Sequence, residues 1–319
     1  MATAMQLQAQ LPSVTSASDV GHNTSGLDCL LVVIRHIYSH MPSEYLDKVN
    51  NISNREGQAK NPILKLGWLD IDETHPEVHK EWVQAKKDAI HAFKGDVSHS
   101  ARFDELAASK VMTDTIWSTP EFRIVIHGHA AISEKLLLTV NRRQTPGISF
   151  QEHIDLNFQS FAPRISVNVR SLPALVDTPA VVFNIPSEPP ASRRTQVALR
   201  SDTPPVGFSI PSEPPAARRT EMTARPAVIR VIYSTQKDQT PFAFSTLKEM
   251  AVPVHEAYSS SGLCLYKLFA AVNMATDQVK TYDYLGECRM SWPKSEGKQW
   301  SLKDKVDGQF MLLYACSYK

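Results

Sequence analysis

GHNTSGLDCLLVVI, residues 21–34, joins a polar stretch directly to an almost uninterrupted apolar one. Apolar residues continue at helical spacing as far as residue 41, and other apolar residues fill the remaining faces. A helix that is apolar on all sides is buried in the protein core. The segment therefore predicts a central, buried helix over residues 26–41, with its N-terminal cap supplied by Asn23, Thr24 and Ser25.

The rest of the chain divides into a helical first part and a strand-rich last part. Amphipathic patterns predict helices over residues 76–93 and 102–112 and strands over residues 122–126 and 136–140. Later, short runs of Val, Ile, Tyr and Phe between turn residues predict four strands, at 227–233, 264–272, 279–284 and 309–315. Helices first and strands later indicate an α+β fold.

Composition excludes several classes of function. The 319 residues include 34 Lys and Arg against 33 Asp and Glu, so the net charge is +1. This balance argues against a nucleic acid or an anionic membrane as partner. Residues 1–22 have neither the basic start nor the apolar run of a signal peptide, and four cysteines do not make a disulfide framework. We therefore expect a cytoplasmic or nuclear protein with reduced thiols.

Proline is concentrated in one segment that contains an internal repeat. Ten of the 21 prolines lie between residues 177 and 226. Residues 177–195, DTPAVVFNIPSEPPASRRT, recur with few changes as residues 202–220, DTPPVGFSIPSEPPAARRT. Proline at this density blocks helices and central strands. We predict a disordered, exposed insertion over residues 186–225, which is either a docking peptide for a peptide-recognition domain or a tolerated duplication in a surface loop.

The insertion implies a single domain in two parts. We expect a disordered tail over residues 1–22, a first domain part over residues 23–185, the proline-rich insertion over residues 186–225, and a second domain part over residues 226–319.

Residues 23–31, NTSGLDCLL, resemble the nucleophile box of the ubiquitin-specific proteases, a family of papain-like cysteine peptidases. Three later segments are similar, in the same order, to the strands that close such domains: YKLFAAVN at 266–273, TYD at 281–283 and FMLLY at 310–314. The resemblance places Ser25 at the nucleophile position and Asp283 at the position that orients the catalytic base. It implies a papain-like fold, in which a helical N-terminal lobe with a central buried helix packs on a C-terminal antiparallel β-sheet.

The chain departs from this family where catalysis depends on it. The nucleophile position holds Ser25 instead of cysteine, Val20 stands where the oxyanion donor is expected, and no histidine follows His255. A hydroxyl without a base is a poor nucleophile. The paired CxxC motifs that bind zinc are also missing, so no metal or cofactor is expected. We predict a catalytically inactive domain that acts as a protein-binding or scaffold module for ubiquitin or a ubiquitin-like modifier.

The sequence leaves two alternatives open. Cys29, four residues after Ser25, could be the nucleophile of an active cysteine-type deubiquitinating hydrolase if the loop register shifts by one helical turn, because a helix N-terminus stabilises a thiolate. His255, from a neighbouring loop, could then act as the base. Alternatively, the chain is an unrelated α+β interaction protein.

Overall fold

The computed structural model describes the segments of the chain over residues 24–39, 62–69, 75–93, 102–117, 122, 124–126, 129–131, 137–141, 147–165, 222–224, 226–236, 241–253, 263–293, 300–304 and 308–317. The predicted tail over residues 1–22 and most of the predicted insertion over residues 186–225 lie outside them. Within the insertion, the described residues Met222–Ala224 form a short strand. For the other residues of 186–225, the predicted disorder stays a prediction.

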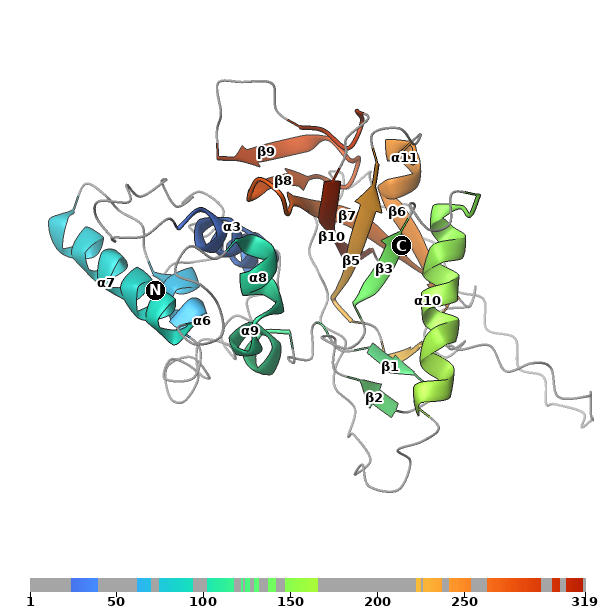
Figure 1. Cartoon of the computed structure of the whole chain (residues 1–319), viewed down its shortest axis with the longest axis horizontal. Helices are drawn as coiled ribbons and strands as arrows, with labels where there is room; N and C mark the ends of the chain where they lie inside the picture. Colours follow the sequence, from blue (N-terminus) through green and yellow to red (C-terminus); the bar gives the residue numbers. More distant parts are fainter. Residues whose placement is uncertain are drawn as a thin grey trace, which may run out of the picture.

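A group of helices from the first part of the chain gathers at one side of the large sheet, on the left in Figure 1. The central helix is α3, which contacts α6, α8 and strand β8 and is buried over almost its whole length. The prediction of a central, buried helix is thereby confirmed. The helices of this group are α3 (Ser25–Ser39), α6 (Pro62–Trp68), α7 (Pro76–Ala92), α8 (Phe103–Ala108) and α9 (Lys110–Thr115).

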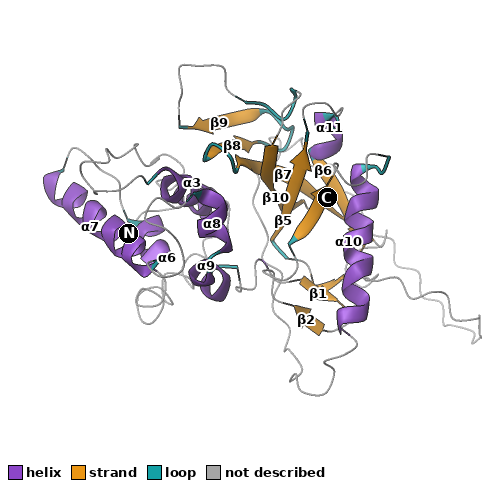
Figure 2. Cartoon of the chain, in the orientation of Figure 1, coloured by secondary structure: helices purple, strands orange, loops and turns teal. Residues whose placement is uncertain are grey.

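The large sheet has seven strands among the described residues, in the order β3-β5-β10-β7-β8-β9, with β6 beside β7. Figure 2 shows it as the orange layer between the helices of the N-terminal group and helix α10 (Phe150–Ile165). The strands are β3 (Leu138–Asn141), β5 (Val228–Thr235), β6 (Glu249–Pro253), β7 (Leu263–Asn273), β8 (Gln278–Tyr282), β9 (Cys288–Trp292) and β10 (Gly308–Ser317).

The predicted antiparallel sheet is in fact mixed. The pairs formed by β6, β7, β8, β9 and β10 are antiparallel, as is the pair of β5 with β10, but β3 runs parallel to β5. Parallel neighbours need a long crossover connection, and the chain between β3 and β5 contains α10. The coarse α+β prediction is confirmed, while the all-antiparallel arrangement is wrong at this edge.

A second, smaller sheet and one short helix complete the described elements. β1 (Ile124–Ile126) pairs with both β2 (His129–Ala131) and β4 (Met222–Ala224), each in antiparallel fashion. Helix α11 (Phe244–Leu247) directly precedes β6.

Strand β10 separates two hydrophobic cores. Met311 and Leu313 belong to the core shared with the helical group, whereas Phe310, Leu312 and Tyr314 belong to the core shared with α10. This alternation follows from the strand geometry, because successive side chains point to opposite faces of a sheet. Both faces of the sheet centre are therefore covered, which explains why the strands of the last part are apolar along nearly their whole length.

Two helical segments differ from their predictions for local reasons. The helix predicted over residues 102–112 is split into α8 and α9 at Ser109, whose backbone is extended and whose Oγ accepts a hydrogen bond from the amide of Met112. Helix α10 was not predicted from the sequence. Its start carries a reciprocal cap, in which Glu152 accepts from the Ser149 amide and Ser149 Oγ accepts from the Glu152 amide. The Ser-x-x-Glu spacing of residues 149–152 is typical of a helix N-terminus and could have predicted this start.

Helix α10 also closes two edges of the sheet through side-chain amides. Gln151 donates to the carbonyl of Ala251 in β6 (2.7 Å) and accepts from its amide (3.0 Å). Asn157 makes the same pair of hydrogen bonds with Thr139 in β3. The two side chains are six residues apart, a rise of about 9 Å along a helix. The sheet must therefore curve strongly enough for one helix to reach both of its edges, at β3 and at β6. The backbone amides and carbonyls of Ala251 and Thr139 are thereby hydrogen-bonded to α10 and are not open to pairing with another strand.

Replacing Gln151 by Met should destabilise the fold by about 1–2 kcal/mol, because the Ala251 amide and carbonyl lose their partners in a half-buried position. Urea unfolding of the full chain would measure this loss. Gln84→Met is the matched control, since Gln84 is an exposed residue of α7 that bonds to Asp88 at the surface. Equal stability of the two variants would contradict the assigned role of Gln151.

Candidate functional site

The candidate site is built on the N-terminus of α3. The carbonyl of Thr24 accepts the first helical hydrogen bond, from the amide of Asp28 (2.8 Å). The Thr24 hydroxyl donates to the Asp28 carboxylate, Oγ1 to Oδ2, at 2.9 Å. Thr24 thus occupies the capping position, and Ser25 is the first residue of the helix, as the polar stretch in the sequence predicts.

A single carboxylate joins this helix start to the sheet. Ser25 Oγ donates to Asp277 Oδ2 at 2.9 Å, and the backbone amide of Phe103 donates to Asp277 Oδ1 at 2.9 Å. Asp277 belongs to the tight turn between β7 and β8, and the Arg102 guanidinium also donates to the Met274 carbonyl of that turn. The turn therefore holds the N-termini of both α3 and α8, and Asp277 satisfies one of the unpaired amides at the start of α8.

The backbone of Asp277 explains why aspartate suits this turn. Its φ of 52° lies in the left-handed region, which Asp and Asn tolerate better than most residues. The side chain of Asn273 stabilises the same turn by accepting from the amide of Ala275 (3.0 Å). No local sequence pattern pointed to Asp277. A turn between two apolar strands was visible there, but its helical partners are 174 and 252 residues away in the chain.

A buried ion pair lies one helical turn further along. Lys86 of α7 approaches Asp28 to 2.5 Å, and the side chains of both residues are almost completely shielded from solvent. The Lys86 ammonium also lies over the Trp82 ring, 4.8 Å from its centroid. Burial raises the pKa of Asp28 and lowers the pKa of Lys86, and the opposite charge of each partner counteracts these shifts. The pair ties α7 to the start of α3.

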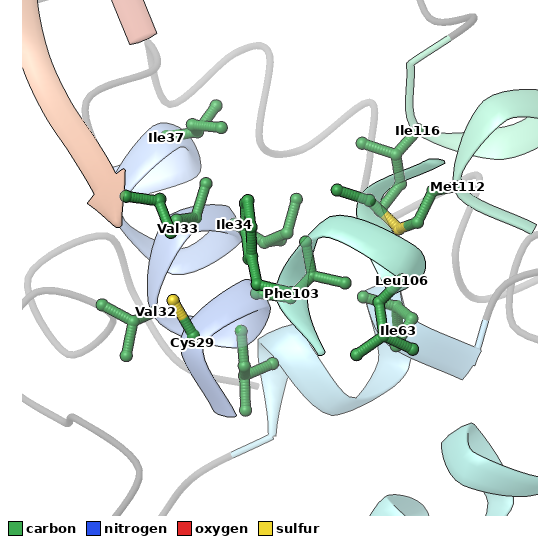
Figure 3. Packing of buried hydrophobic residues seen from close by; sticks show 14 of the residues in the cluster. Cys29, Val32, Val33, Ile34, Ile37, Ile63, Phe103, Leu106, Met112 and Ile116 are labelled. Carbon is green, nitrogen blue, oxygen red and sulfur yellow. The ribbon is translucent and has the colours of Figure 1, made fainter. Parts of the chain in front are cut away.

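Cys29 lies in the hydrophobic core. Its side chain has no solvent exposure, and Figure 3 shows its sulfur among the apolar side chains around α3, near Val32 and Val33. Burial raises the pKa of the Cys29 thiol well above its ordinary value, and the negative charges of Asp277 and Asp28 raise it further. A reactive cysteine needs a lowered pKa and access to solvent. Cys29 has instead a raised pKa and no access to solvent.

Asp283 lies away from Ser25. The carboxylate closes the turn between β8 and β9, where Oδ1 accepts from the amides of Leu285 and Glu287 at 2.9 Å each and Oδ2 approaches Arg289 to 2.6 Å. Partial burial raises the pKa of Asp283, but these hydrogen bonds and the Arg289 charge outweigh burial and leave it below its ordinary value.

Strand β8 separates Asp283 from the turn that meets Ser25. Asp277 and Asp283 are on opposite sides of this five-residue strand, so their backbones are about 20 Å apart at the usual rise per residue. The structure thus brings Ser25 together with Asp277 and not with Asp283. The assignment of Asp283 to the base-orienting position stays a prediction. His255 and Val20 lie outside the described residues.

Comparisons with known proteins identify no relative: no family model, curated protein or solved structure matches the chain. In the described part of the chain, no cluster of three or more His, Cys, Asp or Glu side chains could hold a metal ion. No helix in that part is both long and apolar enough to cross a membrane.

Replacing Lys86 by Met should destabilise the protein by about 3–5 kcal/mol at neutral pH, because Asp28 would be left buried without its partner. The loss should shrink at acidic pH, where the unpaired carboxyl takes up a proton. Thermal and urea unfolding across pH 4–8 would measure it.

The double variant Asp28→Asn, Lys86→Met should recover most of the lost stability, since neither charge then remains in the core. Lys87→Met is the control, because Lys87 is the exposed neighbour on the same helix. A loss of stability in Lys87→Met equal to that in Lys86→Met would contradict the role of the buried pair.

The native protein should protect Cys29 from alkylation. Iodoacetamide at pH 8 should modify the exposed Cys288 rapidly, and Cys29 slower by about three orders of magnitude or more, because Cys29 reacts only after the core opens. Mass spectrometry of the digested protein would measure both rates. Modification of the two cysteines at similar rates would show that Cys29 is accessible.

Proposed function

We propose that the chain is a catalytically inactive, papain-like domain of the ubiquitin-specific protease type that acts as a protein-binding module, with ubiquitin or a ubiquitin-like modifier as its partner. The sequence resemblance at residues 23–31 and in the later strands is the starting point. Ser25 at the first turn of a buried helix, and the packing of that helix against β8, support the papain-like arrangement.

The observation that carries the proposal is the hydrogen bond from Ser25 to Asp277. Acyl transfer by a serine needs a base that removes the hydroxyl proton, most often an imidazole. Here the hydroxyl faces a carboxylate, which as a class of group is a much weaker base. Moreover, the other oxygen of that carboxylate caps α8. The nucleophile position thus serves to connect two helices with the sheet, which suits a structural role.

The burial of Cys29 supports the same conclusion. An active hydrolase that used this thiol would need α3 to expose Cys29 to solvent and the thiol to ionise. The core packing and the raised pKa of Cys29 disfavour both events. The burial of Cys29 thus supports the absence of hydrolysis by this thiol, and binding without hydrolysis is the function that we propose.

The full-length protein should bind ubiquitin or a ubiquitin-like modifier and leave the modifier intact. Titration into ¹⁵N-labelled ubiquitin, and into labelled ubiquitin-like modifiers in parallel, would detect binding through chemical-shift changes. A fluorogenic substrate amidated at the ubiquitin C-terminus would measure hydrolysis. We expect shifts with at least one modifier and no hydrolysis above the buffer rate.

Three variants separate the possible outcomes. Ser25→Ala and Ser25→Cys should both bind like the wild type and stay inactive, because the first has no nucleophile at position 25 and the second places its thiol beside the Asp277 carboxylate instead of an imidazole. Hydrolysis by the wild type that disappears in Cys29→Ala would establish the active cysteine hydrolase instead. Failure to bind any modifier, with the protein folded, would refute the proposed partner.

A further inference from the structure

Two cysteines of different strands meet in the core on the α10 side of the sheet. Cys264 is the second residue of β7, and Cys316 is the last residue but one of β10. Their Sγ atoms are 3.2 Å apart, and the side chains are 5% and 1% exposed. A shift of roughly 1 Å would bring the sulfurs to the length of a disulfide bond.

The pair lies close to the ends of its two strands. Leu263, which precedes Cys264, is half exposed. The backbone pairing of β10 extends one residue beyond Cys316, to Ser317 opposite Leu265. Strand ends of this kind open locally at a much lower free energy than the whole domain. Each thiol can therefore be reached without unfolding of the core.

We propose that Cys264 and Cys316 form a redox-sensitive pair, which hydrogen peroxide oxidises to an intrachain disulfide that links β10 to β7. The thiolate of one cysteine attacks the peroxide O–O bond and becomes a sulfenic acid, and the peroxide oxygen that leaves takes up a proton as water. The second thiol then attacks this sulfur, and the sulfenic oxygen leaves as a second water. In sum, two thiols and one hydrogen peroxide give one disulfide and two waters.

The other two cysteines have different environments. Cys29 belongs to the separate core around α3, and Cys288 is exposed on β9, where its thiol donates to the Met290 carbonyl. The 264–316 bridge would join residues 52 positions apart. Closing a loop of this length restricts the unfolded chain and so stabilises the native state. Oxidation should therefore make the protein more resistant to unfolding, reversibly.

The test treats the full-length protein with a small excess of hydrogen peroxide and compares intact mass, thiol number and melting temperature with those of the untreated protein. We expect a mass lower by about 2 Da, two reactive thiols in denaturant where the reduced chain has four, and a melting temperature higher by about 5 °C or more. Dithiothreitol should reverse all three changes. Peptide mapping should place the link between Cys264 and Cys316.

Variants give the matched controls. Cys288→Ser should still lose about 2 Da, whereas Cys264→Ser and Cys316→Ser should not. Mapping of the wild type does not depend on the folding of any variant. Peroxide treatment that oxidises Cys288 and leaves 264 and 316 as free thiols, or a link between other cysteines, would overturn the proposal.

Discussion

The carboxylate of Asp277 connects the helical group with the sheet. Its two oxygens bind Ser25 at the start of α3 and the amide of Phe103 at the start of α8, so one turn sets the positions of two helices. Both hydrogen bonds involve an ionised acceptor, which makes them stronger than those between neutral groups. Asp277 adopts a left-handed backbone in this turn, which the paired strands β7 and β8 flank on either side.

The ion pair of Asp28 and Lys86 extends this connection to α7. Charges in an apolar core are costly, and their removal from water is offset when each faces the other at short range. Thr24 adds a further hydrogen bond to Asp28. The start of α3 therefore contains a compact polar network in a hydrophobic setting. The resemblance to a peptidase family points to a nucleophile at Ser25. The hydrogen bonds around Ser25 instead link the starts of α3 and α8 to the turn between β7 and β8.

Much of the fold could be predicted from the sequence, because its strongest signals are local. The apolar run after Ser25 predicted α3, and the amphipathic pattern of α7 gave its bounds to within one residue. The strand runs of the last part likewise became β5, β7, β8 and β10. The break at Ser109 was harder to predict, because a helical pattern continues across it. Helix α10 was missed although its Ser-Glu cap was present in the sequence.

In the candidate site, the helix start at Ser25 could be predicted from the sequence, but the contacts of Ser25 could not. A polar cap before an apolar run is enough to place Ser25 at a helix N-terminus, since capping depends on neighbours in the chain. What Ser25 touches depends instead on Asp277, 252 residues away, and no local pattern connects the two. The same holds for the Cys264 and Cys316 thiols, for the two sheet edges that α10 closes, and for the parallel pairing of β3. Local side-chain chemistry thus set the elements and their caps, while long-range packing selected which polar groups meet, because burial forces each of them to find a partner wherever the chain brings one.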